Sequence, residues 1–561
     1  MLSRSTLFRS LLLISFLAVP QFSAAQGTEP ASVSASDVKL LRDAGVSTET
    51  AGLLAFLRSH AHSAEDQIRL ATRIQELGSP IFRERERASE ELVAASRFAL
   101  SFLRPALSSS DPEVRRRSER CIEQINARPD AALISAAARL LATSKSPGTV
   151  EALLAVLPSI EEENAEEVAI QALAQVGLKS GVPAPAIVAA AGDSRALVRS
   201  AAGFVIGQGN AEQRASAVRL LRDSDPIVRF RAALGLLRSA DHSAISPLIA
   251  LLEDGPVELA WQAEERLLRL LGDGNHLPPA VGLDPASRHR ARVMWDESWR
   301  SQDPHVDLNK LLHKENHLGL TLVVTLNLGN KSNKGTVGET TRDGKTRWEI
   351  TDLDRPIDAE LLSDGHILIA EYGKMRVTER RRDGKIVWEF ITPGEPVHCR
   401  RLANGNTFIS TYNELLEVTR DKTVVSSIKL ASGTVAYDAR HLDNGNIVYV
   451  TSMNQIIETD ASGKQLHSIK VSGTNWASVE PIPNGRYLLA LYHSKRVVEL
   501  DQSGKECREF KVDGPTHAIR LHNGNTLVAC NEGQYLVEFD AAGKEVWRQS
   551  TPGRPFRAYR R

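Results

Sequence analysis

The sequence predicts a multidomain α + β protein, in which an N-terminal α-solenoid precedes a six-bladed β-propeller closed by the C-terminal strand. Residues 317–561 repeat one pattern six times with a period of about 40 residues and several short strands per unit, which is typical of propeller blades. Residues 37–272 are rich in Ala, Leu, Arg and Glu and show helical periodicity without strand alternation. At 561 residues the chain is also too long for a single core.

Residues 1–25 have the features of a secretory signal peptide. Arg4 and Arg9 form a basic start, residues 11–18 are apolar, and small residues favour cleavage before Gln26. An uncleaved anchor is the alternative. No later stretch reaches about 18 apolar residues, so we expect no stable membrane insertion after cleavage. The predicted location is therefore the bacterial envelope, either periplasmic or secreted.

Composition narrows the classes of partner and cofactor. Lys+Arg and Asp+Glu both number 69, so no net charge favours binding to nucleic acid. The four cysteines form no CxxC motif and suggest no disulfide framework, so we expect structural thiols. They are Cys121, Cys399, Cys507 and Cys530.

The helical half contains a repeat of its own. Asp111 and Asp225 each begin the pattern Asp-Pro-x-Val-Arg, in which Asp caps the helix and Pro takes its first position. Downstream Ala residues let neighbouring helices approach closely, and we expect Arg229 to form a stacked ion pair. These motifs resemble HEAT repeats of the short type of about 30 residues, most closely over 110–280. That resemblance implies a concave surface that binds a partner protein or peptide.

Earlier in this half, residues 67–77 predict a helix with one apolar face. The residues expected on that face are Ile68, Leu70, Ala71, Ile74 and Leu77.

Residues 273–316 form a linker between the two halves. Residues 286–300 predict a helix that carries Trp295 and Trp299 on one face. We expect it to cap the solenoid or to wedge against the next domain. Stacking of these rings on carbohydrate is the alternative.

Each propeller unit predicts four strands joined by short turns. Asn-Gly pairs such as Asn404-Gly405 favour a type I′ turn between the first two strands. A second turn usually contains Gly-Lys. One Glu recurs in every unit and is therefore expected to be structural. The six are Glu339, Glu379, Glu417, Glu458, Glu499 and Glu538.

The first unit lacks its first strand, and the end of the chain resembles one. Residues 553–560 align with 394–401, at the same offset from the strand-four Trp547 and Trp388. The C-terminal strand is therefore predicted to enter blade one and close the ring, which removes open edges. A solvated basic tail is the alternative.

The strand-four endings, such as Gly384-Lys385-Ile386-Val387-Trp388, resemble the PQQ-like propeller repeat. The resemblance covers about 240 residues and implies the fold rather than the cofactor. His467 and Arg508 replace Trp in two units, the blades are too few for a quinoprotein dehydrogenase, and there is no vicinal-Cys motif. PQQ is therefore not expected. The whole arrangement resembles exported bacterial HEAT/propeller proteins.

Function is predicted where the units differ. The residue two positions after the start of each innermost strand is expected to point toward the axis, and we call these six residues the axial ring. They are Asp358, His398, Asp438, Ser478, His517 and Arg557. Two His and two carboxylates suit a divalent metal or general acid–base chemistry. Alternatively, they pair with one another across blades, and Tyr437 and Trp476 flank the channel mouth or fill the core.

Two functions of different classes follow. The first is a non-catalytic scaffold that binds protein or another ligand through the solenoid groove and the propeller face, with no cofactor. The second is a propeller enzyme, a metal-dependent hydrolase or transferase working at the axial ring. No complete catalytic set is present in the sequence, which favours the scaffold.

Overall fold

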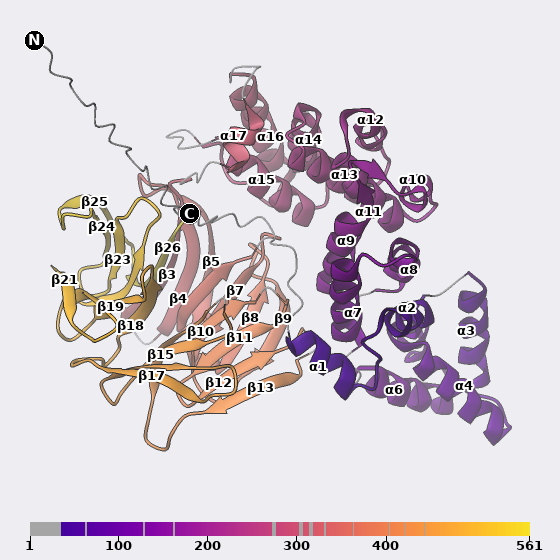
Figure 1. Ribbon diagram of the computed structural model, residues 1–561, viewed down its shortest axis with the longest axis horizontal. Helices are drawn as coiled ribbons and strands as arrows, with labels where there is room; N and C mark the ends of the chain where they lie inside the picture. The colour runs from indigo at the N-terminus through magenta and orange to yellow at the C-terminus, as the bar shows by residue number, and fades with distance from the viewer. Residues whose placement is uncertain are drawn as a thin grey trace, which may run out of the picture.

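The computed structural model describes most of the chain as two repeat domains side by side (Figure 1). The predicted signal peptide lies outside the described residues. No helix of the described chain is long and apolar enough to cross a membrane. The description covers residues 35–561 except 62–63, 127–129, 161–162, 272–276, 302–306, 314–317, 330–331, 363, 403, 421 and 443.

Short helices connected by tight turns build the N-terminal domain, as predicted. Its helices are α1 (Ala35–Asp43), α2 (Thr50–Ser59), α3 (Ala64–Glu76), α4 (Phe82–Ala94), α5 (Leu100–Ala106), α6 (Pro112–Asn126), α7 (Asp130–Ser144), α8 (Thr149–Val156), α9 (Glu163–Val176), α10 (Pro185–Ala190), α11 (Ala196–Gly207), α12 (Ala211–Leu220), α13 (Pro226–Arg238), α14 (Ile245–Asp254) and α15 (Val257–Leu271). One feature was not predicted. Strands β1 (Leu178–Lys179) and β2 (Val182–Pro183) pair around Ser180 and Gly181, which both have positive φ.

The Asp-Pro motifs cap helices as expected, but the Arg acts differently. Asp111 Oδ1 accepts from Glu113 N at 2.8 Å, and Asp225 Oδ1 accepts from Ile227 N at 2.9 Å. Arg229 forms no ion pair within the described chain and instead donates to the carbonyls of the preceding turn, at residues 223 and 224. The guanidinium thereby satisfies carbonyls of the turn between α12 and α13.

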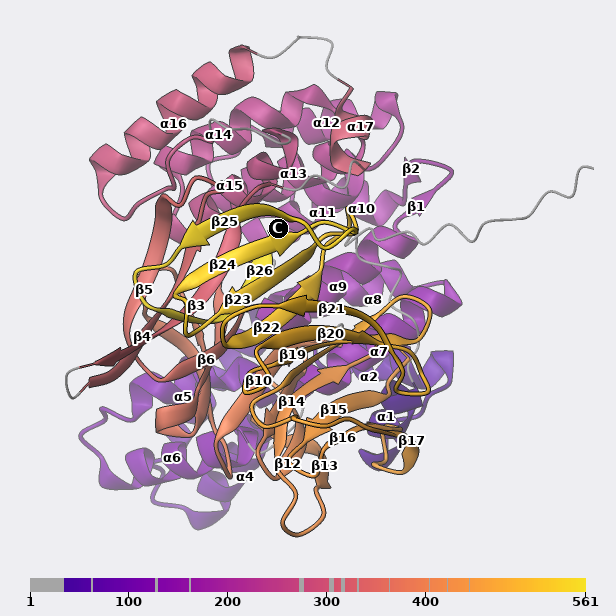
Figure 2. The same cartoon turned by 90° about the vertical axis from the view of Figure 1, so that its left-hand side faces the viewer.

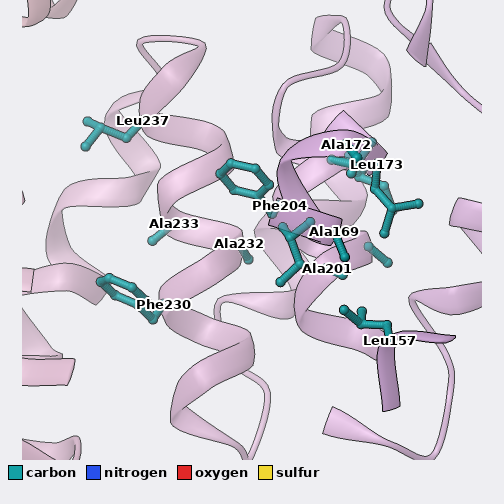
Figure 3. Packing of buried hydrophobic residues seen from close by; sticks show 14 of the residues in the cluster. Leu157, Ala169, Ala172, Leu173, Ala201, Phe204, Phe230, Ala232, Ala233 and Leu237 are labelled. Atoms are coloured by element: carbon teal, nitrogen blue, oxygen red, sulfur yellow. The ribbon is translucent and has the colours of Figure 1, made fainter. Parts of the chain in front are cut away.

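Small residues let the inner helices pack closely (Figure 3). Ala201 and Ala232 are fully buried between α11 and α13. Gly235 approaches the backbone of Phe204 so tightly that a Cβ there would lie 2.3 Å from the Phe204 carbonyl oxygen. Close approach of helices at small residues is therefore confirmed, and glycine extends it.

The face predicted for residues 67–77 is only partly correct. Leu70 and Leu77 are buried, whereas Ile68 is 71% exposed. Leu70 and Leu77 belong to a second, smaller core that α3 to α6 form apart from the main solenoid core. One face of α3 meets that core, and Ile68 lies outside it.

The linker helix is α16 (Pro285–Arg300), followed by α17 (Leu308–His313). Trp295 is buried in the same core as the solenoid helices, and Trp299 packs against that core. α16 packs on α14, as Figure 2 also shows. The helix therefore caps the solenoid, and its two rings are structural.

Six four-stranded antiparallel sheets form the propeller. Blade 1 contains β26 (Arg554–Arg560), β3 (Thr321–Gly329), β4 (Ser332–Thr340) and β5 (Thr346–Asp354). The other blades are β6 (Pro356–Leu361), β7 (Ile367–Glu371), β8 (Arg376–Arg380) and β9 (Ile386–Ile391); β10 (Pro396–Arg401), β11 (Thr407–Thr411), β12 (Glu414–Val418) and β13 (Val424–Lys429); β14 (Ala436–His441), β15 (Ile447–Thr451), β16 (Gln455–Thr459) and β17 (Gln465–Lys470); β18 (Ser478–Ile482), β19 (Arg486–Leu491), β20 (Arg496–Leu500) and β21 (Glu506–Lys511); β22 (Pro515–Arg520), β23 (Thr526–Cys530), β24 (Tyr535–Phe539) and β25 (Glu545–Ser550).

The last strand of the chain lies inside the first blade. β26 pairs antiparallel with β3, with Pro555 opposite Thr325 and Arg557 opposite Val324. The innermost strands contact one another in the order β26, β6, β10, β14, β18 and β22, and β22 contacts β26. The C-terminal residues are therefore part of a sheet and not a solvated tail.

The Asn-Gly turns differ from the type I′ prediction. Both residues have positive φ at Asn484-Gly485, but at Asn404-Gly405 only Gly does. There the Leu402 carbonyl accepts from Gly405 N, and Leu402 N donates to the Asn406 carbonyl. This is the longer hairpin loop in which a single left-handed Gly is enough.

Some of the repeated Glu residues join adjacent blades, whereas Glu417 accepts from Asn404 and Asn406 of its own blade. Glu379 on β8 accepts from Arg401 of the next blade at 2.6 Å, and Glu499 accepts from Arg520 of the next blade at 2.6 Å. The tryptophan on the fourth strand of a blade makes a second link to the next blade, because Trp388 Nε1 donates to the Arg420 carbonyl at 2.7 Å. These contacts agree with the structural role predicted for the Glu residues.

Helix α15 joins the two domains through buried charges. Its Glu264 accepts from Arg347 Nη2 at 2.9 Å and from Arg382 Nη1 at 2.5 Å. Its Glu265 pairs with Arg561, the last residue of the chain, at 2.8 Å. Buried ion pairs fix geometry, because any other arrangement leaves a charge unpaired. These ion pairs were not predicted from the sequence.

Candidate functional site

The axial ring forms because the innermost strands share a local irregularity. In five of the six blades the register between the first and second strands shifts just before the ring residue, as between Pro396 and His398. Such bulges re-aim a side chain. All six ring residues are buried, and hydrogen bonds or ion pairs link five of them, with Ser478 as the exception. The structure therefore gathers the predicted residues in one place.

Asp438 is the centre of the cationic half of the ring. Arg440 Nη1 lies 2.6 Å from Asp438 Oδ1, and Arg557 Nη2 lies 3.0 Å from the same oxygen. The other oxygen accepts from Val479 N at 3.0 Å. One carboxylate thus holds two guanidiniums from two different blades.

Asp358 is the centre of the other half. His398 Nδ1 lies 2.6 Å from Asp358 Oδ2, and the Tyr559 hydroxyl donates to Oδ1 at 2.6 Å. Burial alone would raise the pKa of Asp358, but His398, Arg557 and Arg440 lower it below its ordinary value. Burial, reinforced by Asp358, raises the pKa of Tyr559. At neutral pH the pair is therefore a carboxylate and a neutral phenol.

Both ring histidines are held neutral. Burial and the charge of Arg440 lower the pKa of His398 despite Asp358, and burial with Arg557 and Arg440 lowers that of His517. His517 Nδ1 lies 3.1 Å from the Ala558 carbonyl, which leaves Nε2 to accept from Arg440 Nη2 at 3.3 Å. The ring is therefore a network of matched donors and acceptors.

Some ring atoms keep hydrogen-bonding capacity. Within the described chain, His398 Nε2, Ser478 Oγ and Arg557 Nε are buried without a hydrogen-bond partner. With Nδ1 donating to Asp358, His398 Nε2 is an acceptor, while Arg557 Nε is a donor. Atoms of both kinds suit water or a hydroxyl group, which donates and accepts.

A second layer of side chains follows two residues further along the same strands, because alternate residues of a strand share a face. Its members are Glu360, Arg400, Arg440, Glu480, Ile519 and Tyr559. Burial raises the pKa of Glu360 to about 7, although Arg401 N donates to it at 2.7 Å. From the blade order, Glu360 and Glu480 lie on opposite sides of the ring. This layer was not predicted from the sequence, although the same alternation indicates it.

The axial ring is poorly suited to bind a metal ion, whereas another cluster of side chains has the spacing of metal ligands. Arg440 and Arg557 already bring positive charge to Asp438. Among the described residues, a cluster with ligand atoms close enough for one ion is Asp364, His366 and Glu379, away from the ring. There His366 Nδ1 lies 3.0 Å from Glu379 Oε1 and 3.2 Å from Asp364 Oδ2, so one ring nitrogen joins both acids.

Tyr437 and Trp476 lie together where the innermost strands begin. Their rings stack with centroids 5.9 Å apart and an interplanar angle of 28°. Trp476 is 40% exposed, so its ring is not fully used in core packing.

One family model and several solved structures are similar to parts of this chain. Residues 183–269 match the family model of HEAT repeats. A Bacteroides caccae protein of unknown function is 20% identical, over 43% of this chain and 98% of that one, with a TM-score of 0.37. Catalytically inactive Staphylococcus aureus virginiamycin B lyase with quinupristin is 13% identical, over 42% and 85%, with a TM-score of 0.32. Apo AztD from Citrobacter koseri is 10% identical, over 43% and 96%, with a TM-score of 0.29.

No protein of curated function matches the chain in sequence. The matched helices lie within α10 to α15, and the sheets that follow number six. This chain therefore joins a helical domain that carries HEAT repeats to a six-bladed β-propeller.

Proposed function

We propose that the protein is an exported, non-catalytic scaffold that binds a partner through its solenoid and a ligand through its propeller. The proposal rests on the way in which the carboxylates of the axial ring are paired with other side chains. Asp358 and Asp438 are engaged by Tyr559, Arg440 and Arg557, so neither carboxylate is available as a base or as a metal ligand. A catalytic acid or base needs access to substrate, and both carboxylates are buried.

The solenoid offers a surface for the partner. Arg238 on α13 and Arg266 and Arg269 on α15 form what we call the basic face. Among the described residues, no hydrogen bond or ion pair engages Arg266. Burial and the neighbouring charge of Arg269 lower the pKa of Arg266.

The nearby acids already have partners. Glu167 is bound by Arg231, and Glu265 is shared by Arg561 at 2.8 Å and Arg269 at 4.0 Å. Positive charge is therefore in excess at the basic face, and the partner that fits it is an acidic protein segment.

Export is part of the proposal and rests on residues 1–25. A basic start, a short apolar run and small residues before Gln26 support secretion to the envelope. The PQQ-like character of the repeat belongs to the proposal too. It is supported by strand-four rings that dock on the next blade, as Trp547 Nε1 does on the Arg342 carbonyl at 3.0 Å.

Binding of poly-glutamate to the full mature chain tests the basic face. We expect binding that weakens with salt, little binding of poly-lysine, and loss of poly-glutamate binding in the double variant Arg266→Glu, Arg269→Glu. Arg87→Glu, an exposed site on α4, is the matched control and should bind normally. Poly-glutamate binding that survives the double variant would refute this surface. Elemental analysis of the same protein adds a check, because a stoichiometric divalent ion lost on His398→Ala would overturn the scaffold.

A propeller enzyme remains the second candidate because of Glu360. A carboxyl group with a pKa of about 7 at a partly exposed position suits general acid–base work. A hydrolase assay with ester and glycoside substrates at pH values around neutrality tests it. Turnover that follows a pKa near 7 and vanishes in Glu360→Gln would establish the enzyme in place of the scaffold.

A further inference from the structure

The end of the propeller where the innermost strands begin carries a chain of aromatic rings that we call the aromatic mouth. Five blades contribute one residue each, and the members are Tyr372, Tyr412, Tyr437, Trp476 and Phe556. Trp476 contacts three of the others edge to face or stacked, with ring centroids 5.9 to 6.3 Å apart. Tyr372 joins the chain through Tyr412 at 5.7 Å. The rings form one continuous surface and not five isolated contacts.

Trp476 is held in a costly conformation. Its φ of 58° lies in the left-handed region, which is unfavourable for a bulky side chain. The turn that imposes it is braced, because Thr474 Oγ1 donates to the buried Thr451 carbonyl at 2.7 Å and Asn454 Oδ1 accepts from Gly473 N at 3.1 Å. The result is a ring that is 40% exposed. Backbone strain of this kind gathers at binding sites, and here it presents a large apolar ring partly to solvent.

The charges around the mouth limit the charge of the ligand that it can bind. The Arg355 guanidinium lies 5.0 Å from the centre of the Tyr372 ring, and that of Arg557 lies 5.7 Å from the centre of Phe556. Two cations already occupy these ring faces, so a cationic ligand would be repelled. The mouth therefore suits a neutral or acidic ligand.

Polar groups at the rim complete the recognition chemistry. The Tyr437 hydroxyl donates to Asn475 Oδ1 at 3.3 Å, which leaves the amide nitrogen of Asn475 as a donor. Burial raises the pKa of Tyr437 and of Tyr412, so both hydroxyls stay protonated, and the Tyr437 oxygen can still accept a hydrogen bond. An aromatic platform edged by a few polar groups binds ligands that have one apolar face and several hydroxyls.

We infer that the aromatic mouth is a saccharide-binding site for a neutral or acidic glycan, which stacks a sugar ring on Trp476 and hydrogen-bonds to the rim. This inference rests on the proposed function, since it names the ligand of the propeller face. It requires no chemistry of the axial ring. The basic face of the solenoid is separate and acts independently.

Indole fluorescence and saturation-transfer NMR on the full mature chain test the inference with four probes. They are chitotetraose as a neutral glycan, trigalacturonate as an acidic one, choline as a cation and adenosine as a flat base. We expect one or both glycans to bind and choline to fail. Binding of neither glycan, or tighter binding of choline or adenosine, would overturn the inference.

Trp476→Gly separates binding from folding. Glycine accepts the positive φ without strain, so the melting temperature should stay the same or rise while glycan affinity falls about tenfold or more. Phe82→Ala removes an even more exposed ring on α4 and should leave glycan affinity unchanged. Glycan binding that persists in Trp476→Gly would refute the site. Poly-glutamate binding should survive in Trp476→Gly. A native chain that binds poly-glutamate but neither glycan would count against the mouth and not against the scaffold.

Discussion

Arg557 of the last strand binds Asp438, a residue 119 positions earlier, with 3.0 Å between Nη2 and Oδ1. The two residues belong to blades 1 and 4, which are opposite in the contact order of the innermost strands. The ion pair therefore spans the axis of the propeller. Neighbouring blades are joined by many contacts, but this one links the end of the chain to the far side of the ring.

Removing the charge of Asp438 should destabilise the propeller strongly. Asp438→Asn leaves Arg557 and Arg440 buried with one carboxylate fewer, which costs about 3–5 kcal/mol in the free energy of unfolding. Chemical denaturation followed by far-UV circular dichroism measures this cost. Asp343→Asn, at an exposed turn, is the control and should change stability by about 0.5 kcal/mol or less. Equal stability of the two variants would show that the buried pair does not hold the ring.

Deletion of residues 554–561 should prevent the propeller from forming a soluble monomer. It removes β26, exposes the edge of β3, and leaves Glu265 buried without Arg561. Size-exclusion chromatography should then show aggregates. Arg561→Ala keeps the strand and is the milder comparison, so it should stay monomeric with lower stability. A monomeric deletion variant with native circular dichroism would show that blade 1 does not need the strand.

Gly235→Ala should weaken the packing of α11 against α13. The added Cβ would lie 2.3 Å from the Phe204 carbonyl oxygen, so the helices must separate at a cost of about 1–3 kcal/mol. Thermal unfolding measures the loss. Gly192→Ala is the matched control, because its Cβ would meet nothing closer than 3.7 Å. If both substitutions shift the melting temperature equally, the close approach carries no special energy.

The contribution of His366 to stability should depend on pH. Burial alone would lower its pKa, but hydrogen bonds to Asp364 and Glu379 raise it to about 10. A folded pKa above the unfolded value gives stability that is complete below about pH 6.5 and is lost as pH rises toward 10. His366→Gln should therefore cost more at about pH 6 than at about pH 10, measured by urea unfolding of both proteins. A cost that does not change with pH would contradict a charged His366.

One thiol per native chain should react with a thiol reagent. Cys507 is exposed, whereas Cys121, Cys399 and Cys530 are buried and free. Burial also raises the pKa of Cys399, which disfavours the reactive thiolate. Titration with 5,5′-dithiobis(2-nitrobenzoic acid) should give one equivalent in buffer and four in denaturant. Cys507→Ser should remove the fast equivalent, and a fast reaction in that variant would mean that a buried thiol opens to solvent.

The sequence by itself determined both architectures and predicted the residues of the axial ring. The repeats make these predictions possible. A period of about 40 residues indicates a propeller blade, and a repeated position at which the residue type varies indicates where the blades differ. The strand pairing of residues 554–560 was predicted in the same way, from the missing strand of the first unit. Local capping by Asp111 and Asp225 also follows from nearest neighbours in the chain.

Only the tertiary structure decided which residues pair and which side chains remain exposed. Asp358 and Asp438 look alike in sequence, yet one meets a phenol and a neutral imidazole and the other two guanidiniums. Likewise Ile68 fits an apolar helical face but remains 71% exposed. Periodicity places a residue on a face, whereas its partners come from strands and helices far away in the chain. Those partners fix charge state, burial and access, and hence function.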